Sequence, residues 1–163
     1  VCTYDSLDGT NIQVGIYDSG IDETHNDFFQ LSGCGLTATN RIIADIGDST
    51  VPTSDHGSHV AGIVAGSGYQ SNQNNNNGVP NNGSAFQWRG MAPNAQLIDG
   101  DRGSGGDIVD MEKLHDAIVN LGMDVSNHSY AVDTNGKYRS YSRTRDESIR
   151  GDSIMFILFL EFH

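Results

Sequence analysis

A helical pattern between two apolar runs near the end of the chain constrains the fold more than any other feature. Residues 107–122 place apolar side chains at helical spacing: Ile108, Met111, Leu114, Ile118 and Leu121. Asp107 is a possible N-cap and Gly122 a C-terminal stop. Residues 123–131 follow at once, and IMFILFL (154–160) has the length of a buried strand. Strand, helix and strand in this order are typical of a parallel sheet covered by helices.

Earlier segments fit the same kind of sheet. IQVGIYD (12–18) is β-rich and apolar with few polar breaks, as expected of a strand that is covered on both faces. RIIADI (41–46) and AQLID (95–99) are further short strand candidates. We therefore expect an α/β fold with a doubly wound, mostly parallel sheet.

The chain has the length of a single domain, and we expect residues 1–163 to form one. Residues 67–90 are so rich in Asn and Gly that they cannot contribute much to a core. We interpret this segment as a surface insertion in the domain.

Charge and cysteine content narrow the classes of partner. The net charge of −12 repels phosphate backbones and anionic lipids, so neither nucleic acid nor a membrane surface is expected as a partner. No apolar run approaches the length of a membrane span, because the run at 154–160 has only seven residues. Cys2 and Cys34 are the only cysteines, which allows one disulfide in an oxidising compartment or two free thiols.

Two side chains with acid–base chemistry occupy informative positions. Asp18 closes the strand 12–18, at the carboxyl end where open α/β sheets bind ligands. His56 opens HGSHVAGIVAG (56–66), whose small residues allow a helix to approach a sheet closely. The positive end of a helix dipole disfavours an imidazolium ion unless a carboxylate compensates. If Asp18 is that carboxylate, the pair fixes the tautomer of the imidazole and leaves its other nitrogen free to accept a proton.

Three blocks of the sequence resemble one family in content and in order. VGIYDSGIDETHNDF (14–28), HGSHVAGIVAG (56–66) and GMAPNAQLI (90–98) resemble the Asp block, the His block and the next strand entry of subtilisin-like serine proteases. The similarity continues to about residue 131. It implies the amino-terminal part of a secreted serine endopeptidase domain that acts on polypeptides and requires no cofactor. Asp18 then resembles the triad acid, and His56 the general base.

The resemblance also implies segments that hold a substrate peptide as an added β-strand. They are GSG and SYA, that is Gly103, Ser104, Gly105, Ser129, Tyr130 and Ala131. Ala131 stands where the family usually has Gly, so the primary specificity pocket is expected to be narrower. Asp27 matches a position that binds calcium in some members, although the Asn-rich segment replaces the loop that supplies the other ligands. The resemblance thus allows calcium at Asp27 but does not favour it.

The nucleophile that the resemblance calls for is not found in these 163 residues. The family carries its serine in a GTSMA-like helix start and an oxyanion donor in an AAGN-like segment, and neither motif occurs here. Removal of the serine from subtilisin lowers turnover about 10⁶-fold. We therefore interpret the chain as a domain truncated on its C-terminal side, a fragment that is inactive alone.

Two alternatives from other classes remain open at this stage. The first is a non-catalytic module that keeps the peptide-binding segments and binds extended peptides without cutting them. The second is a metal-dependent hydrolase that uses Asp18, His56 and His59, because residues three apart share a helix face. The metalloprotease pattern HExxH is absent, so a packed or hydrogen-bonded His59 is favoured over a zinc ligand.

Overall fold

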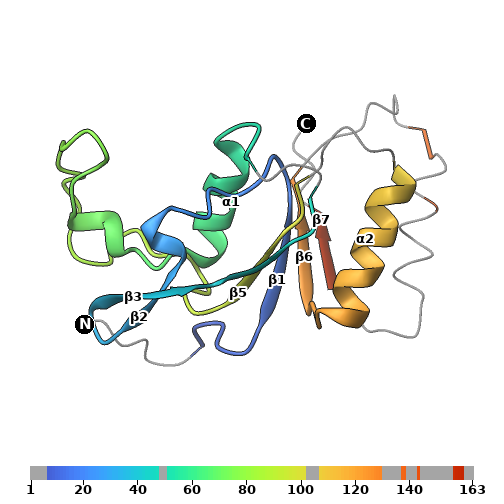
Figure 1. Cartoon of the computed structure of the whole chain (residues 1–163), viewed down its shortest axis with the longest axis horizontal. Helices are drawn as coiled ribbons and strands as arrows, with labels where there is room; N and C mark the ends of the chain where they lie inside the picture. Colours follow the sequence, from blue (N-terminus) through green and yellow to red (C-terminus); the bar gives the residue numbers. More distant parts are fainter. Residues whose placement is uncertain are drawn as a thin grey trace.

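The computed structural model describes residues 7–47, 51–101, 107–129, 137–138, 143 and 156–159. Within them, a sheet of parallel strands has the order β4-β5-β1-β6-β7. These strands are β1 (Gln13–Tyr17), β4 (Ile42–Asp45), β5 (Gln96–Asp99), β6 (Val125–His128) and β7 (Phe156–Phe159). β1 lies in the middle and pairs with β5 on one side and β6 on the other, as Figure 1 shows. The most apolar of the early segments therefore forms the most enclosed strand.

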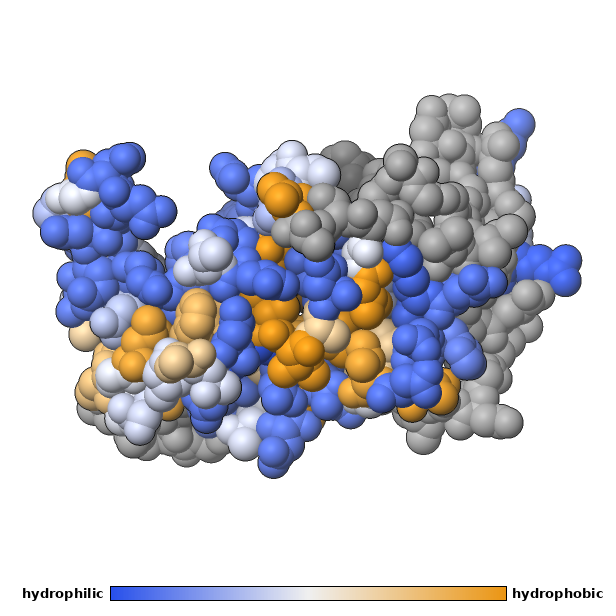
Figure 2. Space-filling view, in the orientation of Figure 1, coloured by the Kyte–Doolittle hydropathy of each residue, from blue (hydrophilic) through white to orange (hydrophobic). Residues whose placement is uncertain are grey.

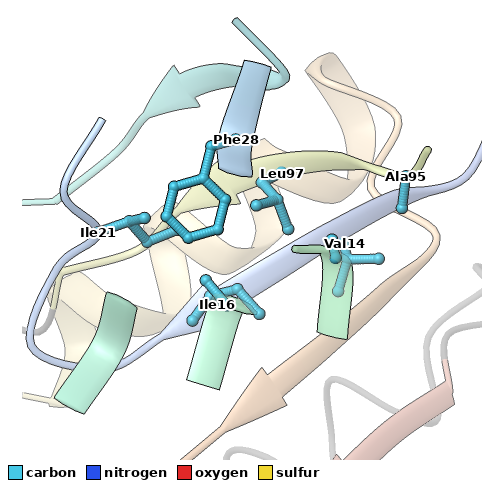
Figure 3. Close-up of a cluster of buried hydrophobic side chains, with 8 residues drawn as sticks. Val14, Ile16, Ile21, Phe28, Ala95 and Leu97 are labelled. Atoms are coloured by element: carbon cyan, nitrogen blue, oxygen red, sulfur yellow. The ribbon is translucent and has the colours of Figure 1, made fainter. Parts of the chain in front are cut away.

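Two helices of the described part of the chain cover opposite faces of this sheet. Val14 and Ile16 of β1 and Leu97 of β5 belong to the core beneath α1 (His56–Ala65), and the apolar side chains of this cluster face one another in Figure 3. Tyr17 and Ile98, one residue further along each strand, belong to the core beneath α2 (Asp107–Asn120). Side chains alternate between faces along a strand, so the two clusters lie on the two sides of the sheet. The predicted doubly wound α/β fold is confirmed.

The connections between the strands make β1 the point from which the sheet extends in both directions. The chain passes from β4 through α1 to the adjacent strand β5, and then through α2 across β1 to β6. Strands made after β1 are thus added on both sides of it, and the helices α1 and α2 that connect them lie on opposite faces of the sheet. Open α/β sheets bind their ligands outside the carboxyl ends of the strands at such a point.

The predicted elements agree with the structure within a few residues, with one addition. The helix expected at 107–122 is α2, and Gly122 follows it with a φ of 75°. Asp107 is the first residue of α2 rather than the cap before it. The antiparallel pair β2 (Phe29–Ser32) and β3 (Gly35–Asn40) was not anticipated, because none of its residues is buried and they carry no continuous apolar run.

The segment 67–90 is mostly exposed, yet it is fixed at its base. It contains the 3₁₀ helix η2 (Tyr69–Asn72) and a single antiparallel bridge between Asn74 and Pro80. Ser67 and Ser71 are almost fully buried, at 1% exposure each. The hydroxyl of Ser71 accepts a hydrogen bond from the backbone N–H of Trp88 at 3.0 Å, which closes the segment.

Among the residues described above, none of the helices is long and apolar enough to cross a bilayer.

Cys34, in the turn between β2 and β3, is disulfide-bonded. Cys2, the other cysteine of the chain, lies outside the described residues. A disulfide at Cys34 resolves one alternative that the sequence left open, since this thiol is not free.

Arg41 is a buried cation that joins three segments through their backbone carbonyls. Its side chain is 4% exposed. One terminal nitrogen donates to the carbonyl of Ala95 at 2.7 Å, and the other donates to Asp27 at 2.7 Å and to Ala65 at 2.6 Å. Ala65 is the last residue of α1, where the carbonyl end of the helix dipole favours a positive charge. The planar guanidinium thus satisfies carbonyls that lie on separate elements.

Replacement of Arg41 by methionine is expected to lower the free energy of unfolding by about 3 to 5 kcal/mol, because three buried carbonyls lose a charged donor. Urea denaturation measures this loss. Arg89→Met, at an exposed position, is the matched control and is expected to change stability by less than about 1 kcal/mol. A loss of the same size in both variants would contradict the role given to Arg41.

Candidate active site

Asp18 and His56 form a hydrogen-bonded pair at the carboxyl end of β1. His56 Nδ1 lies 2.8 Å from Asp18 Oδ1 and 2.9 Å from Oδ2. The side chain of Asp18 is 4% exposed, whereas that of His56 is 57% exposed. An ionised carboxylate only accepts hydrogen bonds, so Nδ1 carries the proton. Among the described residues, every hydrogen bond of this imidazole involves Nδ1, which leaves Nε2 available on the exposed side.

Ser19 fixes the distance between this carboxylate and this imidazole. Its backbone N–H donates to Asp18 Oδ1 at 2.7 Å, which orients the carboxylate. Its hydroxyl accepts the backbone N–H of Gly57 at 2.9 Å, in the first turn of α1. The first N–H groups of a helix have no partner within the helix, so Ser19 supplies a cap from another element. One residue therefore joins the strand that carries Asp18 to the helix that carries His56.

Two glycines allow this close approach. A Cβ atom at Gly57 would lie 2.3 Å from the carbonyl oxygen of Gly20, closer than any ordinary contact. Gly20 itself has a φ of 94°, in the region that favours glycine. The start of α1 consequently packs directly on the backbone of the turn that follows Asp18.

Asp99 supports the same turn from the neighbouring strand. It is 4% exposed at the carboxyl end of β5, and its Oδ2 accepts the backbone N–H of Ile21 at 2.7 Å. Burial raises the pKa of Asp99 to about 7; the bond from Ile21 opposes the shift, and the nearby carboxylates Asp45, Asp101 and Glu23 add to it. The other oxygen, Oδ1, is buried with no hydrogen bond among the described residues. A protonated carboxyl is favoured at such a position.

Asp99 and Ser19 are the residues of this site to which the sequence analysis gave no positioning role. For Asp99 a signal existed, because an acid at the carboxyl end of a parallel strand is the same feature that singled out Asp18. For Ser19 there was none, because its partner on α1 is distant in sequence.

The predicted substrate segments are only partly described. Ser129 follows β6, and its backbone N–H donates to the carbonyl of Tyr17 at 3.3 Å, next to Asp18. Its hydroxyl accepts the side-chain amide of Asn127 at 2.6 Å. The others lie outside the described residues: Gly103, Ser104, Gly105, Tyr130 and Ala131. Peptide binding by these segments stays a prediction.

The surroundings of Asp27 fit hydrogen bonding better than they fit calcium. Its Oδ1 accepts the backbone N–H of Gln70 at 2.8 Å and faces the hydroxyl of Ser67 at 3.4 Å. Calcium binds oxygen atoms and not N–H groups. In the part of the chain that is described, no group of three or more His, Cys, Asp or Glu side chains is arranged to hold a metal ion. Calcium at Asp27 stays a prediction, and no step below depends on it.

His59 is exposed on α1 and does not share the contact that His56 makes with Asp18. It lines an open groove with His25, Ile63 and Met91. Nothing in this arrangement favours its use as a metal ligand together with Asp18 and His56.

Gly57→Ala is expected to displace the start of α1 and to break the contact between Asp18 and His56, since the added methyl group meets the Gly20 carbonyl at 2.3 Å. The cost is about 1 to 3 kcal/mol of stability. Gly62→Ala on the same helix is the control, because a Cβ there has nothing within 4 Å and favours helix. Thermal unfolding and the ¹⁵N resonances of the His56 ring report the two effects; equal behaviour of both variants would exclude the proposed packing.

Asp99→Asn is expected to flatten the dependence of stability on pH. Because its pKa is about 7 in the folded chain, against 3.8 for an unperturbed aspartate, the folded state holds a proton between these pH values that the unfolded state has released. Stability from this group is complete below about pH 4 and is lost as the pH rises through 7. The wild type is therefore expected to lose about 2 to 4 kcal/mol relative to Asp99→Asn over this range.

Urea denaturation between pH 5 and pH 8 tests this difference, and Glu112→Gln, which removes an exposed carboxylate on α2, reports the effect of net charge alone. Parallel pH profiles of the wild type and Asp99→Asn would show that Asp99 is not protonated in the folded chain.

Comparison with known proteins agrees with this geometry. The family model described as "Subtilase family" (Peptidase_S8) matches residues 9–158. An alkaline proteinase from Hapsidospora chrysogena is 29% identical over 124 residues, which cover 74% of this chain and 27% of that protein. The chain thus spans about a quarter of the length of this curated relative.

A solved structure shows a similar fold. The CspB protease of Clostridium perfringens superposes with a TM-score of 0.67 at 20% sequence identity, over 94% of this chain and 36% of that one. MycP1 with its N-terminal propeptide removed gives a TM-score of 0.48 at 15% identity, over 93% of this chain and 44% of that one. With the family model matching almost the whole length, the chain belongs to the subtilase family.

Proposed function

We propose that this chain is the amino-terminal part of a subtilisin-like serine endopeptidase domain, in which Asp18 and His56 are the acid and the base of the catalytic triad. One observation carries the proposal: a buried carboxylate bonds Nδ1 of an imidazole at 2.8 Å, while the rest of the ring is exposed at a sheet switch point.

The geometry suits general-base catalysis. Because Asp18 holds the proton on Nδ1, the lone pair of Nε2 is free to accept the proton of a hydroxyl nucleophile. His56 becomes an imidazolium ion in that step. The adjacent carboxylate stabilises this charge, which the amino-terminal end of α1 alone disfavours. His56 then returns the proton to the leaving amine.

The attacking serine and the oxyanion donor have to come from residues that are not among these 163. No GTSMA-like segment occurs in the sequence, and the chain covers 27% of the alkaline proteinase and 36% of the CspB protease. We infer that this chain alone hydrolyses peptides at no more than a background rate. Gly103, Ser104, Gly105, Ser129, Tyr130 and Ala131 bind the substrate backbone in this proposal.

We also propose that the protein is secreted. The disulfide at Cys34 supports it, because disulfides persist in oxidising compartments and are rare in the cytosol. The charge of −12 is compatible with a polypeptide substrate and unfavourable for nucleic acid.

Two measurements test the proposed function. Sequencing the gene beyond the codon for His163 in all three frames is expected to reveal a GTSMA-like segment. The longer product is then assayed with a fluorogenic peptide. His56→Ala is expected to lower kcat about 10⁶-fold and Asp18→Asn about 10⁴-fold, whereas His59→Ala, on the same helix, is expected to change it less than about tenfold.

Peptide hydrolysis by the 163-residue chain that survives His56→Ala would overturn this assignment. A chelator that abolishes activity, together with stoichiometric zinc, would favour the metal-dependent alternative. Binding of extended peptides without any cleavage by the longer product would favour the binding module.

A further inference from the structure

The acceptor tripeptide for N-linked glycans, Asn-x-Ser or Asn-x-Thr, occurs twice in this chain. One copy is Asn82-Gly83-Ser84 and the other is Asn127-His128-Ser129. Neither contains proline at the middle position, which would block the modification. The structure places these two copies in opposite environments.

Asn82 and Ser84 are both exposed, in the segment 67–90. In Figure 1 the first part of this segment projects away from the sheet as a separate loop, and Figure 2 shows this projection covered mainly by hydrophilic residues. Asn82 has a φ of 61°, so the backbone turns at this point. A bulky sugar attached here meets solvent and needs no rearrangement of the core.

The side-chain amide of Asn82 remains satisfied after modification. One N–H of its Nδ2 donates to the carbonyl of Pro80 at 3.0 Å. A glycosylated asparagine is a secondary amide that keeps one N–H, so this hydrogen bond can persist while the second hydrogen is replaced by the sugar.

Asn127 provides an internal contrast. It lies in β6, is 8% exposed, and is paired in register with Ile16 of β1 and with Leu158 of β7. Its Nδ2 donates to Ser129 Oγ, the hydroxyl of its own tripeptide. A glycan on this side chain is incompatible with the enclosed middle of the sheet.

We propose that Asn82 is an N-linked glycosylation site and that the folded chain carries no glycan at Asn127. The co-reactant is a lipid-linked oligosaccharide pyrophosphate. Asn82 Nδ2 forms a bond to the anomeric carbon of the first sugar, the bond from that carbon to the pyrophosphate oxygen breaks, and Nδ2 loses one proton. Lipid pyrophosphate leaves with the electron pair. No oxidation or reduction occurs.

The compartment required for this reaction agrees with the disulfide at Cys34, which forms under oxidising conditions such as those of the endoplasmic reticulum. This inference goes beyond the proposed protease function, because it needs neither the serine nor the imidazole.

The test is secretion of the 163-residue chain from a eukaryotic host, followed by mass spectrometry of the denatured protein before and after enzymatic removal of N-glycans. The wild type is expected to carry one glycan that the treatment removes. Asn82→Gln and Ser84→Ala are expected to abolish this mass increase completely. Ser84→Thr restores the acceptor motif and is expected to retain it, as is Asn77→Gln, a matched change in the same loop.

Total cell extracts are analysed beside the secreted fraction, so that a variant that fails to fold still reports its modification. An unmodified wild type would overturn the proposal, and so would a mass increase that persists in Asn82→Gln. A glycan found at Asn127 in secreted, folded chain would overturn the part that concerns β6. Each of these results leaves the assignment of Asp18 and His56 unaffected.

Discussion

The hydroxyl of Ser19 is the contact on which the site depends. It accepts the Gly57 N–H of α1 at 2.9 Å, while the N–H of the same residue orients the Asp18 carboxylate at 2.7 Å. The cap and the geometry of the Asp18–His56 pair therefore depend on each other, because a shift of the helix start moves His56 relative to Asp18. The absence of side chains at Gly20 and Gly57 permits the close packing that makes the cap possible.

Two buried ionisable residues, Arg41 and Asp99, are stabilised in different ways. Arg41 keeps its charge, since three carbonyl oxygens surround the guanidinium. Asp99 has one backbone donor and several carboxylate neighbours, so burial favours its neutral form and raises its pKa to about 7. Arg41 thus stays charged, whereas Asp99, which supports the turn after Asp18, changes its protonation near pH 7.

Local patterns predicted much of this molecule. The apolar run that contains Val14, Ile16 and Tyr17 in β1, and the helical spacing of α2, each involve residues a few positions apart, and both elements formed where expected. The pairing of Asp18 with His56 was predicted because Asp18 closes a strand and His56 opens a helix at the same end of the sheet. Long-range contacts were not predicted, because no local pattern indicates that Asp99 accepts a hydrogen bond from Ile21 or that Arg41 donates one to Ala95.

The central place of β1 has a consequence for assembly during synthesis. Gln13 and Val14 leave the ribosome well before their partners Gln96 and Val125. Loop closure over such separations is slow, and topologies dominated by it fold slowly. The strand that leads to Asp18 therefore remains without its neighbours until β5 and β6 have been made, so the Asp18–His56 pair forms on its final support only late in folding.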